Sequence, residues 1–369
     1  MTNSIHFPNN SYTRIVQQSV GHPCRSICFI IPEYINKKIV DNGTGKQRER
    51  AWKNLILTEQ LRGRRQVTAL MSVMFAKSDK LQRTIFDARN TEELPGRLVR
   101  AEGRKPIGEE TVSEAYDYSG DTYKYYQQVH ERNSIDGKGM KLDSTVHYGE
   151  DYNNAFWNGT QMVYGDGDGE IFDRFTKCID VIGHELTHGV TQYEAALEYQ
   201  GQPGALNESF SDIFGSLVKQ YALKQNVDKA DWLIGKGLFA RKVNGVALRS
   251  MKEPGTAYDD PTIGKDPQPG HMKNYVKTSS DNGGVHINSG IPNRAFFFAA
   301  EEIGGKAWEK TGKIWYVTLR DRLRENSDFL ETANLTYEVS GSLYGKDSSE
   351  QKAILNAWNK VGIKIKAKK

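Results

Sequence analysis

The chain has 369 residues, 37% of them hydrophobic and 26% charged, with a formal net charge of +4. This balance is typical of a soluble globular protein with room for two hydrophobic cores, and it excludes an intrinsically disordered chain. No apolar run approaches the roughly 18 residues that a membrane-spanning helix needs, so we expect no membrane partner. Three cysteines (Cys24, Cys28 and Cys178) are too few for a disulfide framework.

The N-terminal segment, 1–65, is basic, with 11 Lys and Arg against 4 Asp and Glu, whereas the remainder carries 39 against 42. Apolar residues at helical spacing predict one helix that opens at Pro32 and a second over about 46–61. We therefore expect this segment to dock on its own acidic body and not to bind nucleic acid. The stretch 62–66, "RGRRQ", is charged and turn-prone, which predicts a linker or a site of proteolytic cleavage.

The next region, 66–205, begins as a β-rich half and ends in a helix. A helical apolar pattern over 113–133 interrupts the strands, and a final helix is expected over about 176–199. Runs of β-branched and aromatic residues predict the strands. They are expected within 67–75, 81–89 and 141–149.

The last region, 206–369, is predicted to be mostly helical. We therefore expect an α+β fold of two lobes, in which the helix over 176–199 lies between a β-rich lobe and a helical lobe. The helices of the last region are expected over 206–222, 291–305, 312–323, 329–345 and 348–362.

The motif "HELTH" provides the first candidate chemistry. His184 and His188 are four residues apart, which places both imidazoles on one face of a helix. Zinc favours nitrogen ligands and, at catalytic sites, takes three protein ligands and a water. Glu185 directly follows the first histidine and is placed to act as a general base. The alternative is two histidines that share a helix face without a metal.

A third ligand is available in "ALNESFSD". Glu208 lies on the next expected helix after His188, and Asp212 lies one turn further along the same face. A carboxylate such as Asp212, or the amide of Asn207, can accept the other N–H of a ligating histidine and fix its tautomer. The alternative interpretation is a solvated acidic face, although the rest of this helix is apolar.

A further histidine follows a glycine turn in "SSDNGGVHINSG". We expect His286 to lie in a loop with Asp281 five residues before it. A histidine oriented by a carboxylate can donate a hydrogen bond to a developing oxyanion. A plain surface histidine is the alternative.

Over residues 85–369 the sequence resembles the thermolysin-like neutral metalloproteases. The resemblance depends on "TVHYGEDYNNAFWNGTQMVYGDGDG" (145–169), "HELTH", "NESFSD", "LRSM" and "DNGGVHINSG", which occur in the family's order and spacing. It implies a two-lobed zinc endopeptidase that cleaves on the amino side of bulky apolar residues. It also implies peptide and protein substrates.

The resemblance implies a role for each matching residue. His184, His188 and Glu208 would be zinc ligands, and Glu185 the base and proton shuttle. Tyr199 and His286 would donate hydrogen bonds in the transition state, with Asp281 orienting His286 and Asp212 supporting His184. The implied substrate contacts are Asn154, Ala155 and Arg249 with the backbone, and an apolar pocket of Phe172, Phe175, Val181, Ile234, Leu238 and Leu248.

The N-terminal segment, 1–65, resembles the propeptide of the protealysin-like subgroup, which is short and carries an Ile-Pro-Pro-type motif. Here "FIIPEYI" (29–35) supplies Ile31 and Pro32, with Glu33 in place of the second proline. The resemblance implies a precursor whose propeptide covers the cleft until it is cut. A cysteine of this segment, Cys24 or Cys28, could bring a thiolate to the zinc, or both could be reduced thiols in a packed segment.

Thermolysin itself binds several calcium ions, and this sequence departs from that pattern. Asp180 and Asp231 match its double-calcium cluster, but Lys219, Leu233 and Lys236 stand where the family has glutamates. Calcium needs six to eight oxygen ligands, whereas an ammonium can neutralise the two aspartates. The loops at 99–105 and 240–247 also lack the matching acids, so we expect the calcium sites to be reduced or absent.

Two other expectations concern assembly and location. We expect a monomer. The N-terminus lacks the basic start and apolar block of a secretory signal peptide, so we expect secretion by another route or, alternatively, a cytoplasmic location. Another zinc peptidase class and a catalytically silent zinc-binding module remain alternatives to the endopeptidase.

Overall fold

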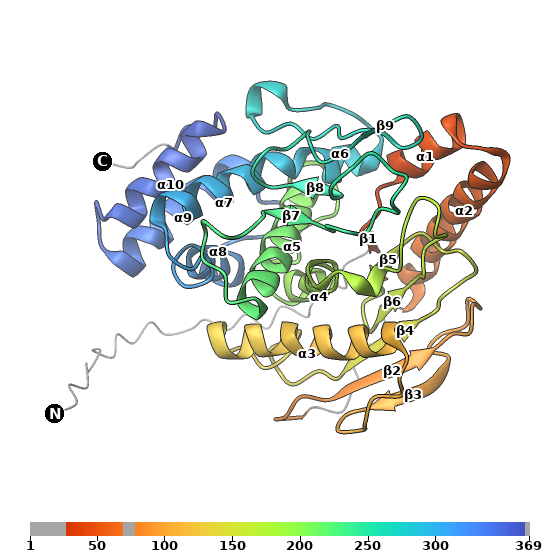
Figure 1. The fold of residues 1–369 in the computed structure, drawn as a ribbon. Helices are drawn as coiled ribbons and strands as arrows, with labels where there is room; N and C mark the ends of the chain where they lie inside the picture. The colour runs from red at the N-terminus through yellow and green to blue at the C-terminus, as the bar shows by residue number, and fades with distance from the viewer. Residues whose placement is uncertain (1–26, 69–77, 366–369) are drawn as a thin grey trace.

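The computed structural model describes residues 27–68 and 78–365, and the side chains of 62–68 are outside that description. The expected strand at 67–75 and Cys24 therefore lie largely or wholly outside the described residues. Among the described residues, no helix is both long and apolar enough to cross a membrane. The expected α+β architecture is confirmed, with a mixed sheet on one side and a group of helices on the other (Figure 1).

A six-stranded sheet forms the first half, in the order β1-β5-β6-β4-β2-β3. The pairs β2–β4 and β4–β6 are parallel, and the remaining neighbours are antiparallel. The edge strand β1 comes from the basic N-terminal segment, so this segment extends the sheet of the body. The strands are β1 (Cys28–Phe29), β2 (Arg83–Asp87), β3 (Arg97–Ala101), β4 (Leu142–Val146), β5 (Ala155–Trp157) and β6 (Met162–Tyr164).

The long helix α3 (Glu110–His130) lies between the sheet and the helical half (Figure 1). Glu109 caps its start, because its carboxylate accepts hydrogen bonds from the backbone N–H groups of Thr111 and Val112 at 2.9 and 2.7 Å. The helix ends where Glu131 adopts a left-handed conformation with φ of 56°. This element confirms the helix predicted over 113–133.

The helical half is built around α4 (Ile179–Tyr193) and α5 (Gly201–Ala222), which pack closely along their length. A Cβ on Gly215 would lie 2.4 Å from the carbonyl oxygen of Asp180, so only glycine allows this approach. The close packing brings the "HELTH" face of α4 against the Glu208 face of α5. The remaining helices are α6 (Asp281–Asn288), α7 (Gly290–Ile303), α8 (Thr311–Asp321), α9 (Phe329–Tyr344) and α10 (Ser349–Lys360).

Short elements complete the body beside these helices. Two small antiparallel pairs form, β7 with β8 and β9 with β10, and β7 contacts α5. The bounds are β7 (Leu233–Ile234), β8 (Arg249–Ser250), β9 (Asp259–Asp260) and β10 (Gly264–Lys265), with 3-10 turns η1 (Phe175–Lys177) and η2 (Met272–Asn274).

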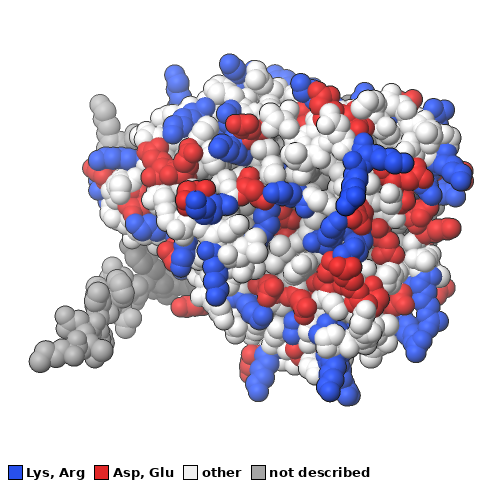
Figure 2. All heavy atoms as spheres, in the orientation of Figure 1, with Lys and Arg blue, Asp and Glu red and all other residues white. Residues whose placement is uncertain are grey.

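The N-terminal segment continues from β1 into a helical hairpin of α1 (Glu33–Asn42) and α2 (Gly45–Thr68), which lies at one side of the body (Figure 1). Arg50 of α2 pairs with Asp151 at 2.8 Å and with Glu170 at 2.9 Å, and both acids belong to the body. Over the face drawn in Figure 2, basic and acidic side chains are interspersed. The basic N-terminal segment therefore docks on the body of its own chain, as expected.

Three local expectations were wrong. The stretch 62–66 is not a turn, because α2 continues through it to Thr68. The "HELTH" helix ends at Tyr193, so Tyr199 lies on the connection to α5. His286 is not in a loop but in α6, where helical geometry resumes after four residues with positive φ at 281–284.

Candidate active site

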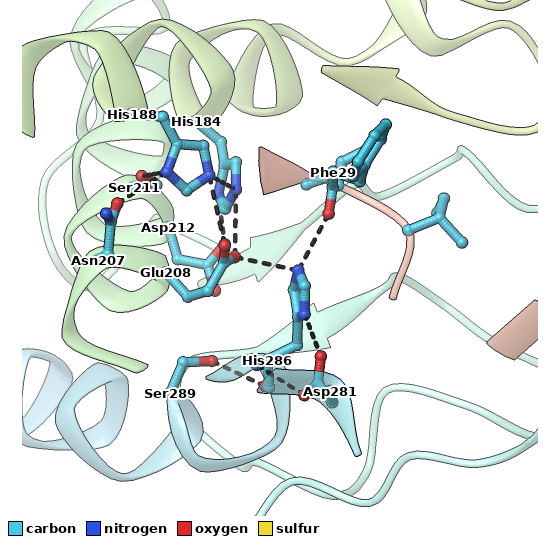
Figure 3. Close-up of polar contacts among 12 residues, drawn as sticks. Phe29, His184, His188, Asn207, Glu208, Ser211, Asp212, Asp281, His286 and Ser289 are labelled. Carbon is cyan, nitrogen blue, oxygen red and sulfur yellow. Dashed lines mark hydrogen bonds and ion pairs between the residues drawn. The ribbon is translucent and has the colours of Figure 1, made fainter. Parts of the chain in front are cut away.

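Three potential metal ligands converge between α4 and α5 (Figure 3). The Nε2 atoms of His184 and His188 are 3.0 Å apart, and each lies 3.4 Å from a carboxylate oxygen of Glu208. All three side chains are buried. Oε2 of Glu208 accepts no hydrogen bond from any described residue, although it is enclosed. The three side chains therefore include a buried carboxylate oxygen that is free to bind a metal ion.

The spacing of these atoms fits zinc. Two ligand atoms at about 2.0–2.1 Å from a tetrahedral ion are about 3.3 Å apart, close to the separations observed. The second nitrogen of each histidine is also fixed. Nδ1 of His184 lies 2.8 Å from Asp212, and Nδ1 of His188 lies 2.8 Å from Oδ1 of Asn207, so both Nε2 atoms point to the shared centre.

Glu185 lies beside this centre and is fully buried. Its Oε2 accepts a hydrogen bond from the backbone N–H of Trp157 at 3.0 Å, whereas Oε1 has no partner among the described residues. Burial raises the pKa of this carboxyl to about 8, although the nearby His184 acts in the opposite direction. A cation at the adjacent centre would favour the ionised carboxylate.

Asp212 is the charged anchor of the site. Arg249 binds it through two parallel hydrogen bonds of 2.8 Å, and Asn293 donates a third of the same length. Burial works to raise the pKa of Asp212, but Arg249 and His184 outweigh it and lower the pKa to about 2. A permanent carboxylate therefore holds both His184 and the arginine that faces the cleft.

A second histidine faces the ligands from α6. Nδ1 of His286 lies 2.6 Å from Asp281, and its Nε2 lies 3.3 Å from the hydroxyl of Tyr199. Tyr199 also donates a hydrogen bond to Glu208. Two hydrogen-bond donors from different elements thus point toward the ligand centre, and Asp281 fixes the orientation of one of them.

The N-terminal segment occupies the cleft as an extended strand. Ala155 accepts a hydrogen bond from the N–H of Ile30 at 3.2 Å, and the amide of Asn154 bonds with both the N–H and the carbonyl of Ile31, at 3.0 and 3.3 Å. Arg249 donates to the carbonyl of Ile30 at 3.3 Å.

Nε2 of His286 lies 3.0 Å from the carbonyl oxygen of Phe29 (Figure 3). The groups expected to bind a substrate backbone are therefore engaged by this strand.

The six residues expected to line an apolar pocket are all buried and belong to one apolar cluster, which also contains Ile30 and Ile31. Phe172 and Phe175 place their rings 5.9 Å apart, and the backbone N–H of Leu248 bonds to the carbonyl of Ile234 at 2.9 Å. Pro32 follows at the N-cap position of α1, where it ends the extended strand.

Sequence reasoning missed three contributors. Asn293 reaches Asp212 from α7, Ser211 lies 3.0 Å from Nδ1 of His188, and the backbone N–H of Trp157 binds Glu185. One of them carried a weak signal, since Asn293 is one of two polar residues, with Arg294, in the mostly apolar run "IPNRAFFFAA". A backbone donor such as that of Trp157 has no signature in the sequence.

A buried lysine lies between the two aspartates that match the family's double-calcium cluster. Nζ of Lys219 lies 2.8 Å from Asp180, 2.9 Å from Asp231 and 2.7 Å from the carbonyl oxygen of Leu233. Burial works to lower the pKa of this lysine, but the two aspartates outweigh it and hold the pKa above its ordinary value. One ammonium therefore pairs with two carboxylates here. Lys236 lies further away, 3.6 Å from Asp231.

Comparisons with known proteins agree with this geometry. Residues 58–192 match the profile described as "Thermolysin metallopeptidase, catalytic domain", and residues 195–363 match "Thermolysin metallopeptidase, alpha-helical domain". The extracellular metalloprotease of Pectobacterium carotovorum subsp. carotovorum is 49% identical over 351 residues, which cover 93% of this chain and 98% of that protein. A thermolysin of Alicyclobacillus acidocaldarius is 43% identical over 288 residues, which are 75% of this chain and 50% of that protein.

Among solved structures, the precursor of protealysin, a metalloproteinase from Serratia proteamaculans, superposes with a TM-score of 0.83. The two chains are 51% identical, and the match covers 91% of this chain and 99% of that one.

Proposed function

The chain belongs to the thermolysin family of metallopeptidases and is a zinc metalloendopeptidase, and we propose that it is a precursor which inhibits itself until its propeptide is cut. The mature enzyme cleaves peptide bonds on the amino side of bulky apolar residues. The observation that supports this proposal is the strand at Phe29–Ile31, because it engages the groups that a substrate backbone would need.

The metal site consists of His184, His188 and Glu208, whose spacing and unused acceptor capacity suit zinc. When bound there, zinc supplies Lewis-acid chemistry, which polarises the scissile carbonyl and makes water a better nucleophile. Asp212 and Asn207 hold the two histidines in the tautomer that ligation requires.

The proton transfers belong to Glu185. Its carboxylate takes a proton from the attacking water and passes it to the nitrogen of the leaving amine. Tyr199 and His286 donate hydrogen bonds to the oxygen that becomes negative as the carbonyl is attacked, and Asp281 keeps His286 oriented. Removing one such donor typically lowers the rate by about 10²–10³-fold.

Substrate is held by backbone contacts on one side and by an apolar pocket on the other. Asn154 and Ala155 bind the extended chain as a strand added to β5, and Arg249 binds the carbonyl of the residue after the cut. The pocket accepts that residue's side chain. Its six members (Phe172, Phe175, Val181, Ile234, Leu238 and Leu248) are apolar and buried, which favours bulky apolar side chains.

Self-inhibition follows from competition for the same contacts. The propeptide, residues 1–65, places β1 along β5 and engages Asn154, Ala155 and Arg249 through Ile30 and Ile31, so a second peptide has no access to these groups. The carboxyl side of this strand is anchored by Pro32 and the helical hairpin. The catalytic body then comprises a β-rich lobe, 66–205, and a helical lobe, 206–369.

We further propose that the enzyme acts outside the cell as a monomer on peptides and proteins, without nucleic-acid or membrane partners. The extracellular relative from Pectobacterium supports the location. Calcium sites are reduced or absent, because Lys219 already satisfies Asp180 and Asp231.

The deciding experiment compares Glu185→Gln with the parent chain. We expect Glu185→Gln to retain zinc, measured by elemental analysis, and to lose cleavage of a blocked peptide that contains a central Phe or Leu. The parent should cleave that peptide on the amino side of the apolar residue once its propeptide is removed. A Glu185→Gln enzyme that cleaves at a rate near that of the parent would contradict the assignment.

A further inference from the structure

The residue before the inhibitory contacts is a cysteine, and its position suggests how the propeptide survives in the cleft. We propose that the precursor holds its own Phe29–Ile30 peptide bond where a substrate's scissile bond would lie, and that Cys28 prevents its hydrolysis by occupying, as a zinc ligand, the position of the attacking water. This proposal deepens the self-inhibition proposed above and depends on it.

The strand at Phe29–Ile31 runs through the site in the direction proposed for a substrate. Arg249, which would bind the carbonyl after the cut, binds the carbonyl of Ile30. His286, which would stabilise the oxygen of the attacked carbonyl, lies 3.0 Å from the carbonyl oxygen of Phe29. Both contacts therefore place the Phe29–Ile30 bond where the bond to be cleaved in a substrate would lie.

The residue after that bond also has the proposed chemical character. Ile30 is a bulky apolar residue and is fully buried in the cluster that contains the six pocket residues. By the proposed specificity, the Phe29–Ile30 bond is therefore one that the enzyme would cleave. Its survival in the precursor requires something besides poor side-chain fit.

Cys28 is the group placed to provide that protection. Its Sγ, a ring nitrogen of His188 and a carboxylate oxygen of Glu208 all lie within 4.8 Å of one another, and all three residues are buried. Cys28 also packs against Tyr199, one of the proposed oxyanion donors. Independently, Oε2 of Glu208 and Oε1 of Glu185 are buried without hydrogen-bond partners among the described residues, as expected of oxygens that face a bound cation.

With zinc bound by His184, His188 and Glu208, the Cys28 thiol would give its proton to solvent, and its thiolate would replace the water as the fourth ligand. Thiolate is a strong zinc ligand, and a zinc with four protein ligands is the closed type found at structural sites. Hydrolysis would add a water oxygen to the carbonyl carbon of Phe29 and transfer one proton to the nitrogen of Ile30. Without a place for that water, the bond does not break.

The first measurement tests whether the sulfur of Cys28 binds the metal ion. The full chain in a Glu185→Gln background, which cannot digest itself, is loaded with Co²⁺ in place of zinc. We expect a near-ultraviolet thiolate-to-cobalt charge-transfer band that disappears in Cys28→Ala. Metal affinity should fall at least about tenfold in the same variant. The parent spectrum needs no substitution at Cys28, so it tests the ligand even if Cys28→Ala folds poorly.

Cys178 provides the matched control. It is also buried, but its Sγ donates to the carbonyl of Lys236 away from the ligand centre. Cys178→Ala should leave the band unchanged. Absence of the band in the parent, or its persistence in Cys28→Ala, would overturn the proposal.

The second measurement tests whether the Phe29–Ile30 peptide bond is cleaved. In the zinc-loaded chain with Glu185 intact, Cys28→Ala should release a fragment that begins at Ile30, detected by mass, at least about tenfold faster than the parent or Cys178→Ala. An uncleaved Phe29–Ile30 bond in Cys28→Ala would overturn the proposal if the activated chain still cleaves the blocked peptide. If no form of the chain cleaves that peptide, the proposed function itself fails, and the cobalt spectrum still decides whether Cys28 binds the metal.

Discussion

Replacing Lys219 by methionine should destabilise the protein by several kcal/mol, because it removes the cation that pairs with Asp180 and leaves Asp231 with only the more distant Lys236. The lysine side chain is 11% exposed, Asp180 is 3% exposed and Asp231 is 30% exposed. Removing one partner of a buried ion pair costs about 3–5 kcal/mol. Asp231 can regain water, which favours the lower end, about 3 kcal/mol.

This free energy converts into a measurable shift of the melting temperature. At about 2.1 cal/mol/K per residue, unfolding of a chain of 369 residues has an entropy of roughly 0.8 kcal/mol/K. A loss of about 3 kcal/mol therefore lowers the Tm by about 4 °C. The assay is thermal unfolding by circular dichroism, with every variant in a Glu185→Gln background to prevent self-digestion.

Lys236→Met is the matched control, because it removes the same charge beside the same cluster. Lys236 is 59% exposed and lies 3.6 Å from Asp231, so its loss should change stability by less than about 1 kcal/mol. The reasoning fails if Lys219→Met lowers the Tm by no more than Lys236→Met does.

The other predictions concern metals, pH and packing. A calcium-selective chelator should change the Tm of the protein by less than about 1 °C, and a large loss of Tm with zinc retained would contradict the calcium proposal. A zinc chelator, in contrast, should abolish peptide cleavage. The hydrogen bond to Asp166 outweighs burial and raises the pKa of His147 to about 9. The protonated His147 therefore stabilises the folded protein fully below about pH 6.5, and this contribution is lost as the pH rises through 9. The stability difference between the parent and His147→Gln in urea should therefore shrink from pH 6 to pH 10, and a constant difference would refute this. Gly215→Ala should cost about 1–3 kcal/mol in urea unfolding, because its Cβ would meet the backbone of Asp180, whereas Gly45→Ala, with no heavy atom within 4 Å, should change little.

Much of the helical framework could be predicted from local patterns, and the errors have identifiable causes. Helices with clear apolar periodicity, such as α3 and α10, begin and end within a few residues of their expected bounds. The charge of the stretch 62–66 favours a junction, yet arginine and glutamine are good helix formers, and one glycine does not break the helix. Charge alone is therefore a poor sign of a turn.

The end of α4 depends on a tertiary contact that local sequence does not reveal. Glu194, directly after the helix, pairs with the buried Arg132, which is 62 positions earlier in the chain. This ion pair anchors the chain where it leaves the helix, so Tyr199 reaches the site from a connection. For His286, the glycines at 283 and 284 correctly indicated a break, but not that the helix resumes after it.

Motif spacing and the resemblance predict that His184, His188 and Glu208 lie together, as they do, whereas the contacts of the surrounding residues carry no such signal. The pairing of Arg249 with Asp212 spans 37 positions, and the contact of His286 with Phe29 spans 257. No local periodicity encodes such register. The site roles themselves stay predictions until the variants above are measured.

The strand β1 has a consequence for how the enzyme would be switched on. While propeptide and body share one chain, their pairing is intramolecular, with an effective concentration on the order of millimolar for a short linker. Cutting the chain converts the same contacts into an ordinary two-body complex. At nanomolar enzyme, a fragment that binds with a Kd of about 1 μM would occupy only about 0.1% of the clefts. Dilution after release into a large volume would thus complete an activation that cleavage alone only begins.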